Sequence, residues 1–293
     1  MTDSPTIARA PTVREILKKT ETYLAGRGVD APRLSAQLLL ARAAGLDRLG
    51  LVMAMDRPLT PGEIEAARGL VARRGRGEPM AYILGEREFY GLDFAVTPAT
   101  LIPRPETELF IDRALALFPG GGLGAFADMG TGSGCLAVTL AVRFPGAAGL
   151  ALDKSGDALA VARQNAVRHG VADRVEFVLA DFAELPQREG GYGLVVSNPP
   201  YVSRAEYGEC SVEVRDFEPE SALVPGETGL EAVPAVARAA LGALAPGGRL
   251  LVEIGWKQGG AAAAIVAAAG FVEVAVRPDL AGCDRLIEAR LPG

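Results

Sequence analysis

Apolar positions in residues 1–84 recur at the spacing of amphipathic helices, and no alternating strand pattern interrupts them. Thr12 and Thr60 each precede a Glu by three residues, which is the form of a capping box, and Asp30 is an N-cap candidate ahead of Pro32. Apolar residues follow each of these starts, including Leu17, Tyr23 and Leu24, then Leu34, Leu38, Leu39 and Leu40, then Ile64, Ala67, Leu70 and Val71. The pattern predicts a small helical bundle over residues 1–84, without a catalytic constellation.

Aromatic residues around a glycine come next. Residues 88–94, Glu-Phe-Tyr-Gly-Leu-Asp-Phe, predict a short β-hairpin, and we expect residues 85–100 to connect two domains. A helix is expected to begin at the prolines of residues 102–108, Ile-Pro-Arg-Pro-Glu-Thr-Glu. Glu106 and Glu108 there have two interpretations, an acid/base pair near a ligand or first-turn carboxylates that stabilise the helix macrodipole.

Beyond residue 123 the pattern changes to strands alternating with helices, which is typical of a doubly wound α/β sheet. The expected strands cover residues 125–129, 149–153, 175–179, 193–197, 249–254, 271–276 and 286–289, and the expected helices residues 135–143, 158–168, 230–244 and 258–269. Residues 277–285 are too few for a crossover helix, so the last two strands should form a hairpin with the final strand antiparallel. We therefore expect a seven-stranded domain over residues 101–293.

Composition narrows the class of protein. With 49% hydrophobic residues the chain can build a sizeable core, and disorder is not expected. No apolar run reaches the roughly 18–20 residues that span a bilayer, and residues 1–15 lack the apolar segment of a signal peptide. The three cysteines are widely spaced and His169 is the single histidine, which argues against a disulfide framework and a zinc site. We expect a cytoplasmic protein with no metal and no membrane partner.

The charge is unevenly distributed. The net charge of −6 argues against a general nucleic-acid binder. Residues 1–84 hold 13 Lys and Arg against 9 Asp and Glu, a net +4, and the remainder holds 17 against 27, a net −10. This contrast favours an N-terminal region that meets a different partner from the rest, although chance scatter on solvated helix faces has about equal weight.

A glycine-rich loop follows the first expected strand. Residues 128–134, Asp-Met-Gly-Thr-Gly-Ser-Gly, lead into a helix whose free N–H groups can face a ligand, so Gly130, Thr131, Gly132, Ser133 and Gly134 are candidate contacts. A dinucleotide fingerprint needs a further Gly where residue 135 is Cys. The spacing argues against NAD and for S-adenosylmethionine, although a tight strand-to-helix turn would also use glycines.

Two acidic strand ends add candidates. Asp153 ends the second strand, where its carboxylate can accept hydrogen bonds from both ribose hydroxyls, and the alternative is a solvated strand end. Asp181 ends the third strand and can accept from an adenine amino group, while Phe182 can stack on the ring. The alternative for this pair is a turn with a core phenylalanine.

The segment around Asn198 is the most informative. Val195 and Val196 predict a buried strand, and Pro199 and Pro200 end it because they cannot donate to a sheet. Asn198 then lies at the carboxyl end of a strand, where open parallel sheets bind ligands, with Tyr201 just beyond. A side-chain carbonyl, acceptor backbone and an aromatic ring suit a planar group that carries an NH2. The alternative is a plain proline-rich turn.

Taken together, these motifs resemble the HemK/PrmC family, which N5-methylates the glutamine of the Gly-Gly-Gln motif in peptide chain release factors. The similarity covers nearly the whole chain, including the helical N-terminal region and residues 89–91, 102–108, 128–134, 198–201, 218–219, 229–230, 253–255 and 279–282. The chain departs from the family pattern at two positions: Phe182 stands where some relatives have Trp, and Cys283 stands where Arg is expected.

The resemblance implies a Rossmann-like S-adenosylmethionine-dependent methyltransferase with an N-terminal helical domain that recognises the release factor. It implies that residues 130–134, Asp153, Phe182 and Asn198 contact S-adenosylmethionine, and that residues 198–201 hold the glutamine. Asn198 and the carbonyl of Pro199 would accept the two amide N–H groups, and Tyr201 would cover the amide plane. We expect a monomer that needs no direct nucleic-acid contact.

Three alternatives remain open at this point. Adenine-N6 methylation of nucleic acid would use the same Asn-Pro-Pro-Tyr chemistry, but it should have a basic groove. Glutamine methylation of another translation protein involves identical chemistry. A module that keeps S-adenosylmethionine as a structural ligand would not need an intact Asn198.

Overall fold

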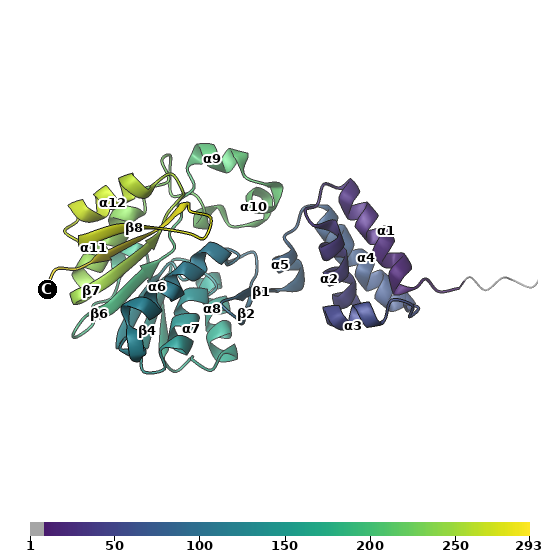
Figure 1. Ribbon diagram of the computed structural model, residues 1–293, viewed down its shortest axis with the longest axis horizontal. Coiled ribbons are helices and arrows are strands. Elements are labelled where there is room, and N and C mark those ends of the chain that lie inside the picture. The colour runs from purple at the N-terminus through teal and green to yellow at the C-terminus, as the bar shows by residue number, and fades with distance from the viewer. Residues whose placement is uncertain (1–8) are drawn as a thin grey trace, which may run out of the picture. The chain divides into compact units, whose positions relative to one another are not determined.

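The computed structural model describes residues 9–293, which divide into two compact units, one ending at Gly85 and one covering Glu86–Gly293 (Figure 1). The first unit is helical, as predicted, and consists of α1 (Val13–Gly26), α2 (Pro32–Ala44), α3 (Arg48–Met53), α4 (Pro61–Gly75) and α5 (Met80–Leu84). Its core is a separate cluster of apolar side chains, in which Val13, Leu24, Leu39 and Leu51 are fully buried.

Two of the three predicted helix starts are confirmed. The hydroxyls of Thr12 and Thr60 each accept from the backbone N–H three residues on. Their own backbone N–H groups donate to the carboxylates of Glu15 and Glu63, so both capping boxes are complete. The prediction for Asp30 is wrong, because Ala31 is the N-cap of α2, with a φ of 47° and no side-chain cap. Pro32 at the first helical position compensates in part, since its fixed φ suits a helix start.

The predicted hairpin is confirmed and belongs to the second unit. Strands β1 (Glu86–Phe89) and β2 (Leu92–Ala95) pair antiparallel around a two-residue turn. Phe89 and Phe94 enter the core of the second unit, and Asn165 of α8 (Gly156–Arg168) exchanges hydrogen bonds of 2.8 and 3.0 Å with the backbone of Ala95. These contacts fasten the hairpin to the outer helix layer.

The second unit is built on a seven-stranded sheet in the order β5-β4-β3-β6-β7-β9-β8. All the neighbouring pairs are parallel except those that involve β9, so the predicted antiparallel final strand is confirmed. The strands are β3 (Ala125–Met129), β4 (Ala148–Asp153), β5 (Val175–Leu179), β6 (Tyr192–Ser197), β7 (Leu244–Glu253), β8 (Val272–Pro278) and β9 (Asp284–Arg290).

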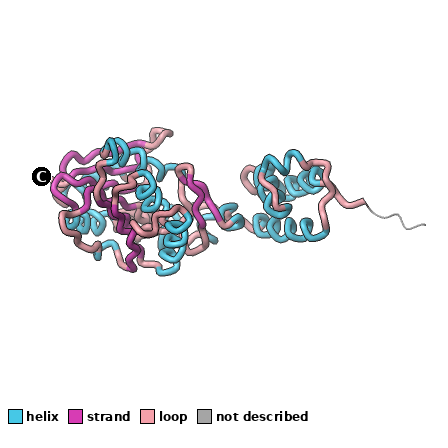
Figure 2. Tube along the Cα trace, turned by 90° about the horizontal axis from the view of Figure 1, so that it is seen from below, coloured by secondary structure: helices cyan, strands magenta, loops and turns pink. Residues whose placement is uncertain are grey.

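Helices cover both faces of this sheet, and Figure 2 shows the strands enclosed between them. One face packs against α6 (Leu109–Leu117), α7 (Cys135–Arg143) and α8, and the other against α11 (Val233–Ala243) and α12 (Gly259–Ala268). Short elements complete the unit: η1 (Pro105–Glu108), η2 (Pro119–Gly121), η3 (Phe182–Glu184), α9 (Arg204–Glu209), α10 (Val212–Phe217) and η4 (Glu220–Ala222). Within residues 9–293, no helix has the length and apolar character needed to cross a membrane.

The register of the sheet aligns the carboxyl ends of the central strands. Met129 pairs with Leu152 on one side and with Ser197 on the other, and Ser197 pairs with Val252. The residues that follow these strand ends therefore emerge beside one another at one edge of the sheet. Because ligands of open α/β folds bind at this edge, the register brings the candidate residues together.

Candidate functional site

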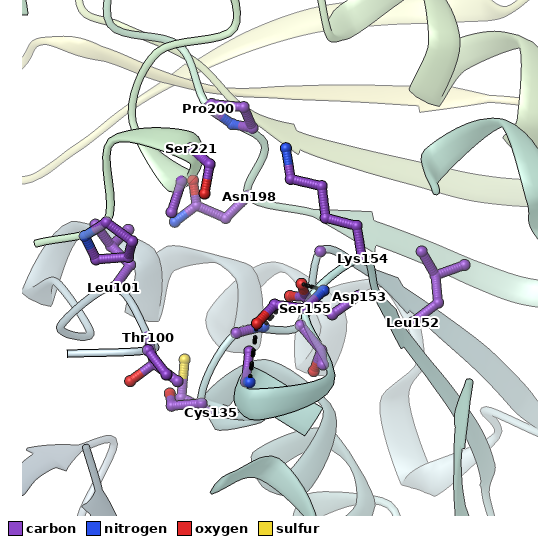
Figure 3. A pocket seen from close by; sticks show the side chains of 18 of the residues that line it. Thr100, Leu101, Cys135, Leu152, Asp153, Lys154, Ser155, Asn198, Pro200 and Ser221 are labelled. Atoms are coloured by element: carbon purple, nitrogen blue, oxygen red, sulfur yellow. Dashed lines mark hydrogen bonds between the residues drawn. The ribbon is translucent and has the colours of Figure 1, made fainter. Parts of the chain in front are cut away.

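A pocket opens at the carboxyl edge of the sheet, between the loops that follow β3, β4, β5 and β6. Figure 3 shows Asp153 and Ser155 at the end of β4, with Asn198 and Ser221 across the pocket from them and the Lys154 side chain reaching toward Pro200. Nine of the predicted site residues line this pocket: Gly130, Thr131, Gly132, Ser133, Asp153, Asp181, Phe182, Asn198 and Pro200. Segments that are far apart in the sequence therefore meet at one site.

The glycine loop is held against the end of β4 by its own backbone. The N–H groups of Gly130 and Thr131 both donate to the carbonyl of Leu152 at 2.9 Å. Gly130 has a φ of 79°, and a side chain there would have its Cβ 2.8 Å from the Phe182 ring. Glycine is required at this position, because the backbone adopts a left-handed conformation where an aromatic ring also approaches.

Gly134 lies between two residues of the pocket wall, Ser133 and Cys135, but does not line the pocket itself. It is the N-cap of α7 with a φ of 81°, and a Cβ there would stand 3.1 Å from Ala162 of α8. Its role in this fold is to let α7 pack closely against α8.

Asp128 stabilises the loop from beneath. Its Oδ2 accepts from the Thr131 hydroxyl at 2.6 Å and from the backbone N–H of Ala137 at 3.1 Å, whereas its buried Oδ1 has no hydrogen-bond partner among the described residues. Burial raises the pKa of Asp128 to about 7, and the hydrogen bonds from Thr131 and Ala137 offset only part of that effect.

Asp153 is preorganised by the same loop. Its two carboxylate oxygens accept one backbone N–H each, from Gly132 and from Ser155, both at 2.9 Å. Each oxygen keeps a free lone pair, so the carboxylate is still able to accept from two further hydroxyl groups. The Lys154 and Ser155 side chains stand beside it in the pocket wall.

The pair after β5 has a local role as well as a place in the pocket. Asp181 caps η3 by accepting from the backbone N–H of Ala183 at 3.3 Å, and its own backbone N–H donates to the Glu184 carboxylate. Phe182 presents its ring to the glycine loop, next to Gly130. The ring is thus positioned to form a flat wall of the pocket.

Asn198 follows the last residue of β6, and its side chain lines the pocket with that of Pro200. Pro199 and Tyr201 do not belong to the pocket wall. The carbonyl of Tyr201 accepts from Gln258 Nε2 at 2.9 Å, and its hydroxyl donates to Glu253 at 3.1 Å. Burial and the nearby Glu253 carboxylate raise the pKa of Tyr201, so this phenol stays protonated.

Two residues at the site were missed as candidates in the sequence, Thr107 and Glu253. Thr107 lies between Glu106 and Glu108, the two carboxylates considered above as an acid/base pair or as first-turn residues of a helix. Glu106 is exposed, and Glu108 accepts from the backbone N–H of Tyr90 at 2.9 Å. Thr107 instead faces inward and donates to Glu253 at 2.8 Å. Glu253 could have been found from its position, because it is a charged residue directly after the apolar run Leu-Leu-Val of a strand.

Glu253 is a buried carboxyl group, with only 1% of its surface exposed. Burial raises its pKa to about 7, although hydrogen bonds from Thr107 and Tyr201 and the positive charge of Arg285 act in the opposite direction. A pKa in this range makes Glu253 sensitive to pH under ordinary conditions, and such groups cluster at functional sites.

One rim of the pocket is fixed by an ion pair. Arg104 pairs with the buried Glu218, which also accepts from the backbone N–H of Ile102 at 3.1 Å. Arg104 and the neighbouring residues Pro219, Ser221 and Ala222 line the pocket. The proline-rich segment before η1 and the segment before η4 are therefore locked together over the pocket.

Cys283, the departure from the family pattern, lies in the turn between β8 and β9. Its backbone N–H donates to Asp279 at 3.0 Å, and Asp279 also pairs with Arg285. The pocket wall described above does not include Cys283.

Comparisons with known proteins agree with this architecture. Two protein-family models match the chain, the PrmC N-terminal domain over residues 15–85 and the methyltransferase small domain over residues 113–213. The fold is shared with the crystal structure of a methyltransferase from Pyrococcus furiosus, with a TM-score of 0.51 and 19% identity, over 78% of this chain and 99% of that one. It is shared also with the hMettl16 catalytic domain, solved in complex with the MAT2A 3'UTR hairpin 6, with a TM-score of 0.56 and 19% identity over 76% of this chain and 81% of that one.

Fold and pocket together define a Rossmann-like methyltransferase. Relatives then narrow the class: the release factor glutamine methyltransferase of Nitratidesulfovibrio vulgaris is 48% identical over 289 residues, 98% of each chain, and that of Geobacter sulfurreducens is 42% identical over 99% of this chain and all of the relative. The chain belongs to the release factor glutamine methyltransferase family. The resemblance to HemK/PrmC proteins is thereby confirmed.

Proposed function

We propose that this enzyme transfers a methyl group from S-adenosylmethionine to N5 of the glutamine in the Gly-Gly-Gln motif of peptide chain release factors. The observation that carries this function is the position of Asn198 in a chain of this family. Its side-chain amide lies in the same pocket wall as the glycine loop and Asp153, so a methyl donor and a planar amide acceptor would meet there.

The residues present fit S-adenosylmethionine. The glycine loop of residues 130–133 allows a ligand to approach its backbone closely. The carboxylate of Asp153 keeps two free acceptor positions, and the Phe182 ring offers a flat apolar surface. These groups match a nucleoside, because its two ribose hydroxyls need acceptors and its planar base needs a flat apolar surface. We propose that these residues hold the donor, with Asp181 beside the base and Asn198 toward the reacting end.

S-adenosylmethionine, when bound, supplies a methyl carbon made electrophilic by its sulfonium sulfur, which keeps the electron pair of the broken bond and leaves S-adenosylhomocysteine. The chain itself must activate the acceptor, because the lone pair of an amide nitrogen is delocalised into its carbonyl. Asn198 Oδ1 and the Pro199 carbonyl accept the two N–H groups of the glutamine amide. These bonds orient the nitrogen for attack and favour its rehybridisation, so the rate acceleration arises from positioning and electrostatics.

The remaining residues of the segment shape the acceptor site. Pro200 lines the pocket, and both prolines fix their φ angles, so the loop keeps its form before the acceptor arrives. Tyr201 covers the amide plane in this proposal. The nitrogen becomes acidic once it carries the methyl group, and it releases its extra proton to water.

The helical unit is proposed to grip the release factor while the second unit receives the Gly-Gly-Gln loop. The net charge of +4 over residues 1–84 and of −10 over the remainder supports two different contact surfaces. We propose that the enzyme acts as a monomer in the cytoplasm, where its substrate takes part in translation, and that it does not contact nucleic acid directly.

The test is mass spectrometry of purified, unmethylated release factor after incubation with the enzyme and S-adenosylmethionine. One added methyl group is expected on the Gly-Gly-Gln glutamine, and Asn198→Ala should abolish it while the fold is retained. Gln187→Ala is the matched control, because its amide bonds to the carbonyl of Gly242 outside the pocket. Methylation of ribosomal protein or DNA in place of the release factor would overturn the substrate assignment.

A further inference from the structure

We infer that Thr107 and Glu253 are positioning residues that hold the Asn198 amide in a single orientation, with its oxygen facing the methyl acceptor. This inference rests on the proposed function, since it assigns Asn198 Oδ1 the role of accepting from the substrate amide. It extends the site to two buried residues from other parts of the chain, neither of which reaches the substrate in this assignment.

The observation is a continuous chain of side-chain hydrogen bonds. Asn198 Nδ2 donates to Thr107 Oγ1 at 3.3 Å, and the Thr107 hydroxyl donates to Glu253 Oε2 at 2.8 Å. The Tyr201 hydroxyl donates to the other carboxylate oxygen, Oε1, at 3.1 Å. Two members of the Asn-Pro-Pro-Tyr segment are therefore connected to each other through one carboxylate.

The direction of these bonds follows from the number of protons available. A threonine hydroxyl has one hydrogen, and when Glu253 is ionised Thr107 uses this hydrogen on the carboxylate. Thr107 can then only accept from Asn198, so the nitrogen of the Asn198 amide must face it. The Asn198 oxygen is left on the other side, and within residues 9–293 no hydrogen bond reaches it.

Burial makes this arrangement stringent. Thr107 lines the pocket wall, yet Thr107 and Glu253 are only 2% and 1% exposed, so solvent is a poor replacement for a missing partner. Their placement is fixed independently, because Thr107 belongs to η1 and Glu253 ends β7, whose preceding residue Val252 pairs with Ser197. An unpaired group in this network would be costly, so the network selects one orientation of Asn198.

The orientation matters for the reaction. With its oxygen toward the pocket, Asn198 accepts a hydrogen bond from an N–H group of the glutamine amide. This bond increases the electron density on the nucleophilic nitrogen. With the amide flipped, its NH2 group would face the NH2 group of the substrate, and two donors would oppose each other. A flip of one side chain would thus disable the acceptor site without any change of backbone.

The experiment compares Thr107→Val with Thr107→Ser and with Glu253→Gln. Valine keeps the shape of threonine and removes the hydroxyl, while serine keeps the hydroxyl. Glutamine offers one acceptor oxygen where the Thr107 and Tyr201 hydroxyls need two, so one of these bonds must reverse. Thr139→Val and Glu288→Gln are matched controls. Thr139 is a buried hydroxyl without a hydrogen-bond partner among the described residues, and Glu288 is a buried carboxylate paired with Arg113 and Arg277.

Two readouts decide the inference. Release-factor methylation by Thr107→Val and by Glu253→Gln should show kcat lowered roughly ten- to a hundred-fold with KM for the release factor nearly unchanged, since only the alignment of the acceptor is lost. The double variant should have a kcat no lower than that of the less active single variant, because both residues act through one network. Thr107→Ser should keep most of the wild-type kcat. In NMR spectra, the side-chain NH2 signals of Asn198, identified by their loss in Asn198→Ala, should move in Thr107→Val and stay in Thr139→Val.

Unchanged kcat in Thr107→Val, or Asn198 NH2 signals that do not move, would overturn the inference. If the wild-type enzyme does not methylate the release factor, the proposed function fails, and the NMR comparison still decides whether Thr107 orients Asn198. Loss of kcat in the two control variants as well would show that any buried polar change disturbs the enzyme, which would also count against a specific positioning role.

Discussion

The hydroxyl of Thr107 donates a 2.8 Å hydrogen bond to the carboxylate of Glu253, although the two residues are 146 positions apart in the chain. This bond joins the proline-rich segment of residues 102–108 to the end of β7, directly beside the Asn198 loop. Segments that look unrelated in the sequence thus form one buried polar network. Its members govern both the pH dependence and the stability that we expect.

Methyl transfer should increase with pH between about 6 and 8. Burial raises the pKa of Glu253 to about 7, and a protonated carboxyl group can donate to Thr107, which then donates to Asn198 and favours the flipped amide. The charged groups around Glu253 are Arg285 and Glu106, and the phenol of Tyr201 remains protonated throughout this range. The measurement is kcat at saturating release factor and S-adenosylmethionine across this pH range.

The pH profile of Glu253→Gln provides the control. Asp128 also has a pKa raised to about 7 by burial, so it titrates in the same range. Glutamine removes the titration of Glu253 alone, and the profile should become flat at a low rate. A profile that keeps the wild-type midpoint in Glu253→Gln would assign the pH dependence to Asp128 instead.

Glu253→Gln should make the protein more stable above pH 7 even though it lowers the rate. The folded state holds the Glu253 proton more tightly than the unfolded chain does, because the pKa rises from 4.5 to about 7 on burial. Stability from this group is complete below pH 4.5 and is lost as the pH rises through 7, and the neutral glutamine avoids that loss.

The expected gain above pH 7 is up to about 3 kcal/mol in the free energy of unfolding, measured by urea denaturation at pH 5 and pH 8. Asp128 contributes equally to both proteins and cancels in the comparison. A variant that is less stable than the wild type at pH 8 would mean that Glu253 stabilises the fold as an anion, contrary to this prediction.

Much of the architecture was readable from the sequence because local patterns determine it. The strand-and-helix alternation predicted all seven strands of the sheet, and the short link before residue 286 predicted the antiparallel β9. Capping boxes at Thr12 and Thr60 were readable because the motif lies within four residues. The Asp30 cap failed, since the left-handed Ala31 leaves the aspartate outside the helix start.

Only part of the site could be predicted from the sequence, because its residues come from segments that are far apart along the chain. Asn198 and the glycine loop could be predicted as site residues, because their residue types follow the end of an expected strand. The orientation of Thr107 depends on which side of η1 faces β7, and the pKa of Glu253 depends on burial by segments from across the fold. Such properties follow from tertiary packing, which no local pattern encodes.

Gly130→Ala should weaken binding of S-adenosylmethionine at least about ten-fold, or 1.4 kcal/mol. The φ of 79° disfavours any side chain, and the added Cβ would stand 2.8 Å from the Phe182 ring, which must move out of the pocket wall. Gly170→Ala is the matched control, because Gly170 has a similar φ of 68° and, apart from Gly170 itself and its two chain neighbours, no atom of residues 9–293 lies within 4 Å of an added Cβ.

Isothermal titration calorimetry with S-adenosylmethionine checks this prediction, with the free energy of unfolding measured in parallel. Both variants should lose stability through backbone strain, and only Gly130→Ala should lose affinity. Equal affinity losses in both variants would mean that strain alone, without the Phe182 ring, accounts for the effect.

Glu218→Ala should destabilise the protein by about 2 kcal/mol, because it leaves the buried backbone N–H of Ile102 without an acceptor and removes the buried half of the pair with Arg104. The Glu218 side chain is 1% exposed, and it accepts from both Arg104 and the backbone N–H of Ile102, which would also lose its partner. Glu220→Ala is the control two residues away, where Glu220 pairs with Arg204 and both side chains are 51% exposed. That exposed pair should contribute less than about 1 kcal/mol. Urea denaturation of the two variants measures the difference, and similar losses for both would show that Glu218 does not anchor the rim of the pocket.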